Sequence, residues 1–155
     1  MEIKSIVEKL MRKYDTNDPF KLAAHLNIVV QHVRLGNTWS YYVCYRRLKA
    51  IHINCDLPEA LQRYTCAHEL GYAVLHKGVP TPFLKRHTLF SVEKIERQAN
   101  TFAVELLMPD NLLKEYEGYP IKDIAYMAGI PEGMELLKPS ILVCPPAALQ
   151  TMITS

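Results

Sequence analysis

The sequence predicts an α+β fold in which helices frame one small sheet. Residues 2–25 carry apolar side chains at helical spacing, residues 28–54 contain three β-rich runs, and two long helical patterns follow from residue 56. A chain of 155 residues is long enough to bury a core without disulfides, so we expect a single domain spanning 1–155.

The first two elements are expected to be helices. Residues 2–14 place apolar side chains at intervals of three and four, which is the pattern of an amphipathic helix facing a core. A second helix is expected with Asp18 as its N-cap and Pro19 at its first position, where the missing N–H of proline costs nothing. His25 in this helix is expected to be structural.

Three β-rich runs come next, at residues 28–33, 39–45 and 49–54. They are rich in β-branched and aromatic residues and are separated by short polar segments. This arrangement predicts a small antiparallel meander.

A long helix is then expected from Asp56, as N-cap with Glu59 three residues on, to about Lys77, before Gly78 and Pro80.

A second long helix is expected from a cap at Ser91 to the stop at Pro109, and it has one apolar face. The segment 121–138 holds two short helical patterns around the turn sequence GIPEG.

Composition excludes some function classes. The 18 basic and 16 acidic side chains leave a net charge of +2, and no run of like charges marks a nucleic-acid or membrane surface. We find no secretory leader and no apolar run near about 18 residues, so we expect a cytosolic protein. The cysteines show no C-x-x-C pairing and are expected to be reduced, buried thiols: Cys44, Cys55, Cys66 and Cys144.

The first long helix carries most of a metal-binding signature. In His-Glu-x-x-His, two imidazoles at i and i+4 bind zinc and the glutamate handles the proton. This chain has His68 and Glu69, but Tyr72 stands at the second histidine position. Thr65, His68, Tyr72 and His76 recur at intervals of three and four, so they share one polar stripe. An isolated His-Glu pair more often lies on a solvated helix face than in a functional site. The spacing of the stripe is the observation that favours a functional site here.

The second long helix offers Glu96, flanked on its own face by Ala99 and Ala103. If the two helices pack antiparallel, these alanines allow a close approach and Glu96 can supply a third ligand to an open zinc site. Gly71 in mid-helix costs about 1 kcal/mol relative to alanine, which also indicates a close backbone approach.

Two segments, AHELGYAVLH and ERQANTFAVELLMP, resemble the ImmA/IrrE family of metallo-endopeptidases, whose pattern is roughly AHELGH..LH followed by E..AN.FA.ELLMP. The resemblance covers residues from about 15 to 110. It implies a zincin-like minimal core with a zinc site between two helices. It also implies a function in cleaving helix-turn-helix repressors of phages, mobile elements or stress operons.

Carried over by position, the resemblance implies that His68 and Glu96 are zinc ligands and that Glu69 is the general base. Asn100 and His76 fall on further motif positions, where support of the ligands is expected rather than ligation.

The remaining ligand position holds Tyr72, which leaves two alternatives. Its phenolate could ligate the metal, or its hydroxyl could hydrogen-bond Glu96 or His68 and fill the space of the ion. His76 is excluded as the partner of His68, because eight residues of helix separate their Cα atoms by roughly 12 Å. Cys66 points away from His68 around the helix. The other imidazoles, His52 and His87, are not assigned as ligands.

Three functional hypotheses follow. The leading one is a zinc metallo-endopeptidase-like protein acting on a helix-turn-helix repressor. The alternative is a catalytically inactive module that docks a regulator through the former substrate groove. A DNA-binding helix-turn-helix at 121–138 is disfavoured by the scarcity of Lys and Arg in that segment. We therefore expect no direct nucleic-acid or membrane partner.

Overall fold

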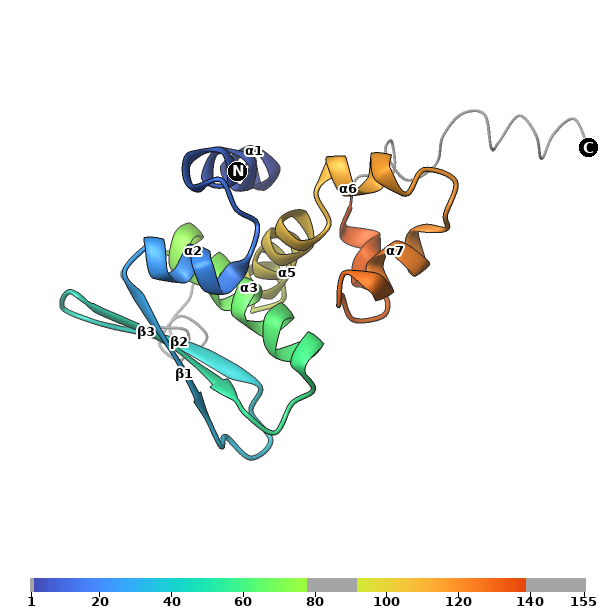
Figure 1. Ribbon diagram of the computed structural model, residues 1–155. Coiled ribbons are helices and arrows are strands. Elements are labelled where there is room, and N and C mark those ends of the chain that lie inside the picture. The colour runs from blue at the N-terminus through green and yellow to red at the C-terminus, as the bar shows by residue number, and fades with distance from the viewer. Residues whose placement is uncertain (1, 78–91, 139–155) are drawn as a thin grey trace, which may run out of the picture.

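A computed structural model describes residues 2–77 and 92–138, and it confirms the α+β class. Helices lie along one face of a small sheet (Figure 1). The elements are α1 (Ile3–Tyr14), α2 (Pro19–His25), β1 (Ile28–Val33), β2 (Ser40–Tyr45), β3 (Leu48–Asn54), α3 (Glu59–Leu75), α5 (Val92–Leu107), α6 (Asp110–Glu115), α7 (Ile121–Met127) and the 3-10 helix η1 (Met134–Leu137).

The sheet is mixed, so the predicted antiparallel meander is wrong. Its strand order is β1-β3-β2, with β1 parallel and β2 antiparallel to the central β3. The chain leaves β1 and crosses the end of β3 before it enters β2. Asn54 holds this crossing, because its side-chain amide donates to the carbonyl oxygens of Gly36 and Thr38, each at 3.0 Å. Strand propensity identified the three strands but contains no information on which strand lies in the middle.

Helix α3 lies between the sheet and α5. It contacts β2 and β3 on one side and α5 on the other, while α1 covers α5 (Figure 1). Ile51 and Ile53 of β3 are fully buried toward the helices, and Leu70 of α3 and Leu106 of α5 are also fully buried. The core therefore surrounds α3, which also carries the metal-binding signature.

Of the two predicted N-caps, Asp18 and Asp56, the structure confirms only the first. The Asp18 cap is confirmed, since its carboxylate accepts from the backbone N–H of Phe20 at 2.9 Å. The predicted Asp56 cap is wrong: α3 begins at Glu59 after Pro58, and the side-chain oxygen of Asn54 accepts from the Asp56 backbone N–H. The side chain of Asp56 therefore lies too early in the chain to cap the helix.

The later boundaries agree with the sequence where the structure describes them. α3 ends at Leu75 and α5 at Leu107. The two short helical patterns of segment 121–138 are α7 and η1. The expected stops and cap at Gly78, Pro80 and Ser91 lie outside the described residues.

The described cysteines are free thiols in different environments. Cys66 is fully buried as expected, Cys44 is partly exposed, and Cys55 is exposed, which corrects the expectation of uniformly buried thiols. Burial raises the pKa of the Cys66 thiol. Cys144 lies outside the described residues.

A partly buried ion-pair network connects Lys138 to the helices. The Lys138 ammonium, whose side chain is fully buried, lies 2.8 Å from Glu105 and 3.0 Å from Asp110. Asp110 also pairs with Lys4 of α1 at 2.7 Å. These contacts join α1, α5 and the start of α6 through charged groups.

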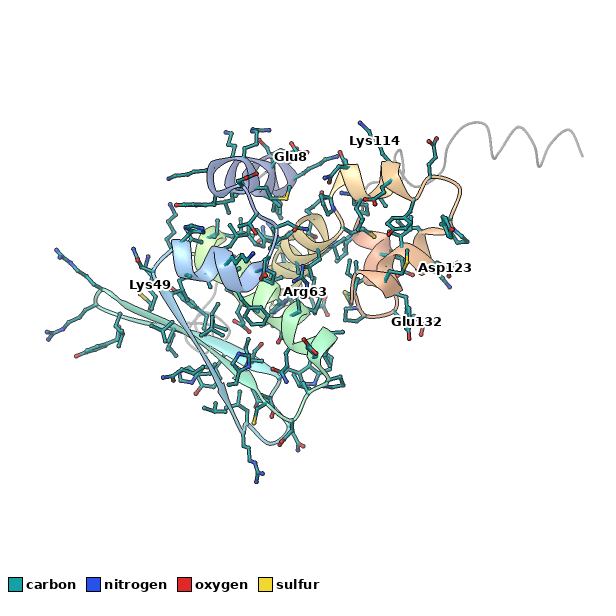
Figure 2. The ribbon with its side chains drawn as sticks, viewed as in Figure 1. Glu8, Lys49, Arg63, Lys114, Asp123 and Glu132 are labelled. Carbon is teal, nitrogen blue, oxygen red and sulfur yellow. The ribbon has the colours of Figure 1, made fainter. Side chains whose placement is uncertain are left out.

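Charged surface side chains are spread over the whole fold. Figure 2 labels six that come from α1, β3, α3, α6, α7 and the turn after α7: Glu8, Lys49, Arg63, Lys114, Asp123 and Glu132. None of the helices in the described ranges combines the length and the apolar character needed to cross a bilayer.

Candidate functional site at the interface of α3 and α5

Helices α3 and α5 pack antiparallel at very short range. Side chains pair in opposite order along the two helices, Tyr64 with Asn100 and Tyr72 with Glu96. A Cβ atom built on Gly71 would lie 3.0 Å from Cβ of Phe102 and 3.1 Å from Cα of Ala99. The close approach predicted from Gly71 and the small alanines is therefore confirmed, and it brings the two polar faces into contact.

The predicted ligand pair, His68 and Glu96, comes together across this interface. Nε2 of His68 lies 3.4 Å from Oε2 of Glu96. On its other side the His68 ring contacts the Asn100 carbonyl, with Nδ1 and Oδ1 at 2.8 Å. A carbonyl oxygen only accepts, so the proton sits on Nδ1 and Nε2 is the ring nitrogen directed at Glu96.

Asn100 also holds Tyr64, a residue that the sequence analysis did not single out. The Tyr64 hydroxyl donates to Oδ1 of Asn100 at 2.8 Å. Burial, together with the charge of Glu96, raises the pKa of Tyr64, so its hydroxyl stays protonated. Tyr64 lies four residues before His68, and that spacing on one helix face was the signal that could have identified it.

Tyr72 occupies the third ligand position as a hydrogen-bond donor. Its fully buried side chain donates from the hydroxyl to Oε1 of Glu96. Burial is the largest cause that raises the pKa of Tyr72, followed by the hydrogen bond and charge of Glu96 and then the charge of Glu69. The phenol is therefore neutral in this arrangement.

Glu69, the predicted general base, is buried beside the sheet. Only 2% of it is exposed, and its Oε1 accepts from Oγ of Ser40 at 2.9 Å. Ser40 begins β2, and nothing in its local sequence links it to Glu69. The contact exists because α3 packs on the face of the sheet that contains β2.

The remaining candidates lie at the edge of this group or away from it. His76 follows α3, its ring centroid is 6.3 Å from that of Tyr72, and its buried Nε2 has no hydrogen-bond partner among the described residues. Thr65 donates to the backbone oxygen of Gln62 at 3.1 Å instead of facing a site.

His52 is separated from the site by the sheet. It alternates with the buried Ile51 and Ile53 and stacks on Tyr41, with ring centroids 4.9 Å apart. It therefore lies on the face opposite α3 and cannot reach Glu96. His87 lies outside the described residues.

These positions do not fit a catalytic zinc ion. Such a site needs three protein ligands and one open position. Among the described residues, His68 and Glu96 supply two donors, and the third position holds the neutral phenol of Tyr72, whose hydroxyl donates a hydrogen bond to Glu96. Across residues 2–77 and 92–138, no group of three or more His, Cys, Asp and Glu side chains is arranged to hold a metal ion.

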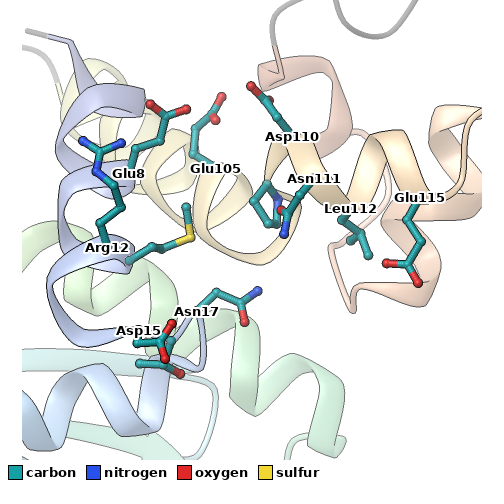
Figure 3. A pocket seen from close by; sticks show the side chains of 12 residues that line it. Glu8, Arg12, Asp15, Asn17, Glu105, Asp110, Asn111, Leu112 and Glu115 are labelled. Carbon is teal, nitrogen blue, oxygen red and sulfur yellow. The ribbon is translucent and has the colours of Figure 1, made fainter.

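Two cavities lie elsewhere on the molecule. The larger, of about 530 Å³, opens between α1, the end of α5 and α6 (Figure 3). The smaller, of about 390 Å³, lies among the start of α3, the end of α5, α6 and α7. His68, Glu69, Tyr72 and Glu96 line neither of them.

Comparison with known proteins agrees with the motif and its setting. Residues 23–136 match the model of Peptidase_M78, the IrrE N-terminal-like domain. A protein described as uncharacterized immunity region protein 2 of Bacillus phage phi105 is 44% identical over 139 residues, which is 88% of each chain. Metallopeptidase ImmA of Bacillus subtilis (strain 168) is 29% identical over 135 residues, which is 83% of this chain and 79% of that protein. By its motifs, its α3–α5 interface and these matches, the chain belongs to the IrrE N-terminal-like (Peptidase_M78) family, the ImmA/IrrE metallopeptidases.

Proposed function

We propose that this protein is a metallopeptidase-like regulator that acts on a helix-turn-helix repressor of a phage, mobile element or stress operon. Family membership supports a protein-directed role. The relative from Bacillus phage phi105 is described as an immunity region protein, which supports a place in phage regulation. A repressor is the partner that the family resemblance implies.

The observation that carries the proposal is the contact between His68 and Glu96 across the α3–α5 interface, with Glu69 next to His68 in α3. Nε2 of His68 lies 3.4 Å from Oε2 of Glu96. Glu69 follows His68 in α3 and is 2% exposed. Burying a carboxylate is costly unless it is hydrogen-bonded, and Ser40 supplies one such bond. Two of the residues that the family resemblance implies for function, His68 and Glu96, therefore lie in contact, and the third, Glu69, follows His68 in the chain.

Between binding and cleavage of the repressor, the geometry favours binding. The Tyr72 hydroxyl donates to Glu96 at the position where a third ligand belongs. Among residues 2–77 and 92–138 two ligands remain, whereas catalytic zinc requires three. We therefore assign docking of the repressor as the leading mode.

Peptide hydrolysis is the second candidate, and the buried Glu69 favours it. In this mode Glu69 accepts a proton from the attacking water and passes it to the leaving amine. The family implies a metal, usually zinc, but the ligand set within the described part of the chain does not fit one, so no step is assigned to an ion.

The test uses the full chain and, as the partner that the family resemblance implies, any helix-turn-helix repressor found among the genes next to its own. Binding is measured by biolayer interferometry with and without EDTA, and cleavage by mass spectrometry with and without zinc. Docking predicts a complex whose Kd changes less than twofold with EDTA or with Glu69→Gln. Glu93→Gln, which changes an exposed carboxylate of α5, is the matched control.

Two outcomes would change the assignment. Repressor cleavage that needs zinc and is lost in Glu69→Gln, but not in Glu93→Gln, would assign hydrolysis. Absence of both binding and cleavage would refute the proposal that the repressor is the partner.

A further inference from the structure

We propose that Tyr72 replaces the metal of this family with a metal-free clamp between α3 and α5. The clamp consists of five side chains: Tyr64, His68 and Tyr72 from α3, and Glu96 and Asn100 from α5. This inference goes beyond the proposed function, since it concerns what holds the site together whatever polypeptide the protein recognises.

The connectivity of the clamp is regular. Its α3 members are spaced four residues apart, and so are its two α5 members, so each group lies on one helix face. Asn100 accepts from Tyr64 and His68, and Glu96 faces His68 through Oε2 and Tyr72 through Oε1. Each α5 side chain therefore bridges two successive turns of α3.

Apolar packing fixes the Tyr72 ring in this position. Tyr72, Ile95 and Ala99 form a small buried cluster of their own, and none of the three is more than 1% exposed. The ring also lies edge-on to His68, with centroids 5.2 Å apart. Because Ile95 and Ala99 of α5 pack with the ring and His68 also contacts it, Tyr72 fills the corner next to the His68–Glu96 pair.

The separation of the two helices suits a phenol at position 72, whereas an imidazole there would leave space before Glu96. Gly71 lets α3 approach α5 so closely that a Cβ atom at this position would lie 3.1 Å from Cα of Ala99. At this separation the Tyr72 hydroxyl reaches the Glu96 carboxylate directly. A shorter imidazole at position 72 would end before that carboxylate and leave space for an ion bound by two histidines and one glutamate.

The experiment compares zinc content and thermal stability of the full chain in three forms: wild type, Tyr72→Phe and Tyr72→His. Zinc is quantified by mass spectrometry after dialysis and by calorimetric titration. We expect no stoichiometric zinc in wild type or in Tyr72→Phe, and one zinc per chain in Tyr72→His with at least 100-fold tighter binding. Tyr126→His places a new histidine on exposed α7 and is the control for zinc uptake by any added imidazole.

Stability gives a second, independent readout. The wild-type Tm should be unchanged by EDTA, and Tyr72→Phe should lower it by roughly 3–12 °C, because it removes a buried hydrogen bond to a carboxylate. In Tyr72→His, zinc should raise the Tm and EDTA should reverse the rise.

Three results would overturn the clamp. One is stoichiometric zinc in wild type that is lost in Tyr72→Phe, which would make Tyr72 a ligand. Another is stoichiometric zinc in both, which would place the ion on other residues. The third is a Tyr72→Phe variant as stable as wild type, and this result counts even if Tyr72→His fails to fold. None of these measurements uses a repressor, so they are separate from the test of the proposed function.

Discussion

Replacing Gly71 with alanine should destabilise the protein, although alanine is the better helix former. In an unconstrained helix the change would stabilise by about 1 kcal/mol. Here the new Cβ would meet Cβ of Phe102 at 3.0 Å, and Cα and O of Ala99 at 3.1 and 3.2 Å. Two of these neighbours are backbone atoms, so α5 itself must shift. Overpacking of this kind costs about 1–3 kcal/mol, and after the gain in helix propensity we expect a net loss of up to about 2 kcal/mol.

The loss is measured as the change in the free energy of unfolding from urea denaturation. The variant pair Arg97→Ala and Arg97→Gly, at an exposed position of α5, measures the Gly–Ala difference without a steric contact. Alanine should be favoured at 97 and disfavoured at 71. The close approach of the two helices would be refuted if Gly71→Ala raised the free energy of unfolding by as much as Arg97→Ala exceeds Arg97→Gly.

Three further predictions concern groups away from the site. Lys138→Ala should destabilise the protein by about 3–5 kcal/mol in urea, because it leaves Glu105 buried without its charged partner, and the double variant Lys138→Met with Glu105→Leu should regain most of the loss. Burial would raise the pKa of Asp110, but hydrogen bonds from its two lysine partners outweigh burial and hold that pKa below its usual value of 3.8. The contribution of Asp110 to stability is therefore present above about pH 4 and lost as pH falls through the lowered pKa. In this acid range the free energy of unfolding of Asp110→Asn should depend less on pH than that of wild type. Equal pH dependence of the two proteins would contradict this prediction. Iodoacetamide should modify exposed Cys55 in the native protein and spare Cys66, whose pKa is raised by burial, and equal labelling by peptide mass mapping would contradict this.

The site illustrates how far local sequence patterns reach. Helical spacing placed His68, Glu69 and Tyr72 on α3, and it placed Glu96 on the facing helix. These assignments need only the 3.6-residue period and hold before any packing is known. Ser40 could not be found this way, because its contact with Glu69 joins residues 29 positions apart through the stacking of strand and helix.

In the sheet, too, local sequence predicted the elements but not their arrangement in space. Residue type identified its three strands, but the prediction of their order failed. Asn54 explains the failure: its side chain holds the chain crossing from β1 to β2 at the end of β3. A contact of this kind depends on where the chain returns in space, and strand propensity does not encode that.

By itself, the sequence determined the three strands, the helices other than α6 (Asp110–Glu115), the family resemblance and the departure at position 72, because each depends on residue type and short-range spacing. Only the tertiary structure decided the order of the strands, the buried partner of Glu69 and the bond from Tyr72 to Glu96. Those features depend on two surfaces meeting, and the distance at which α3 and α5 meet follows from packing around Gly71.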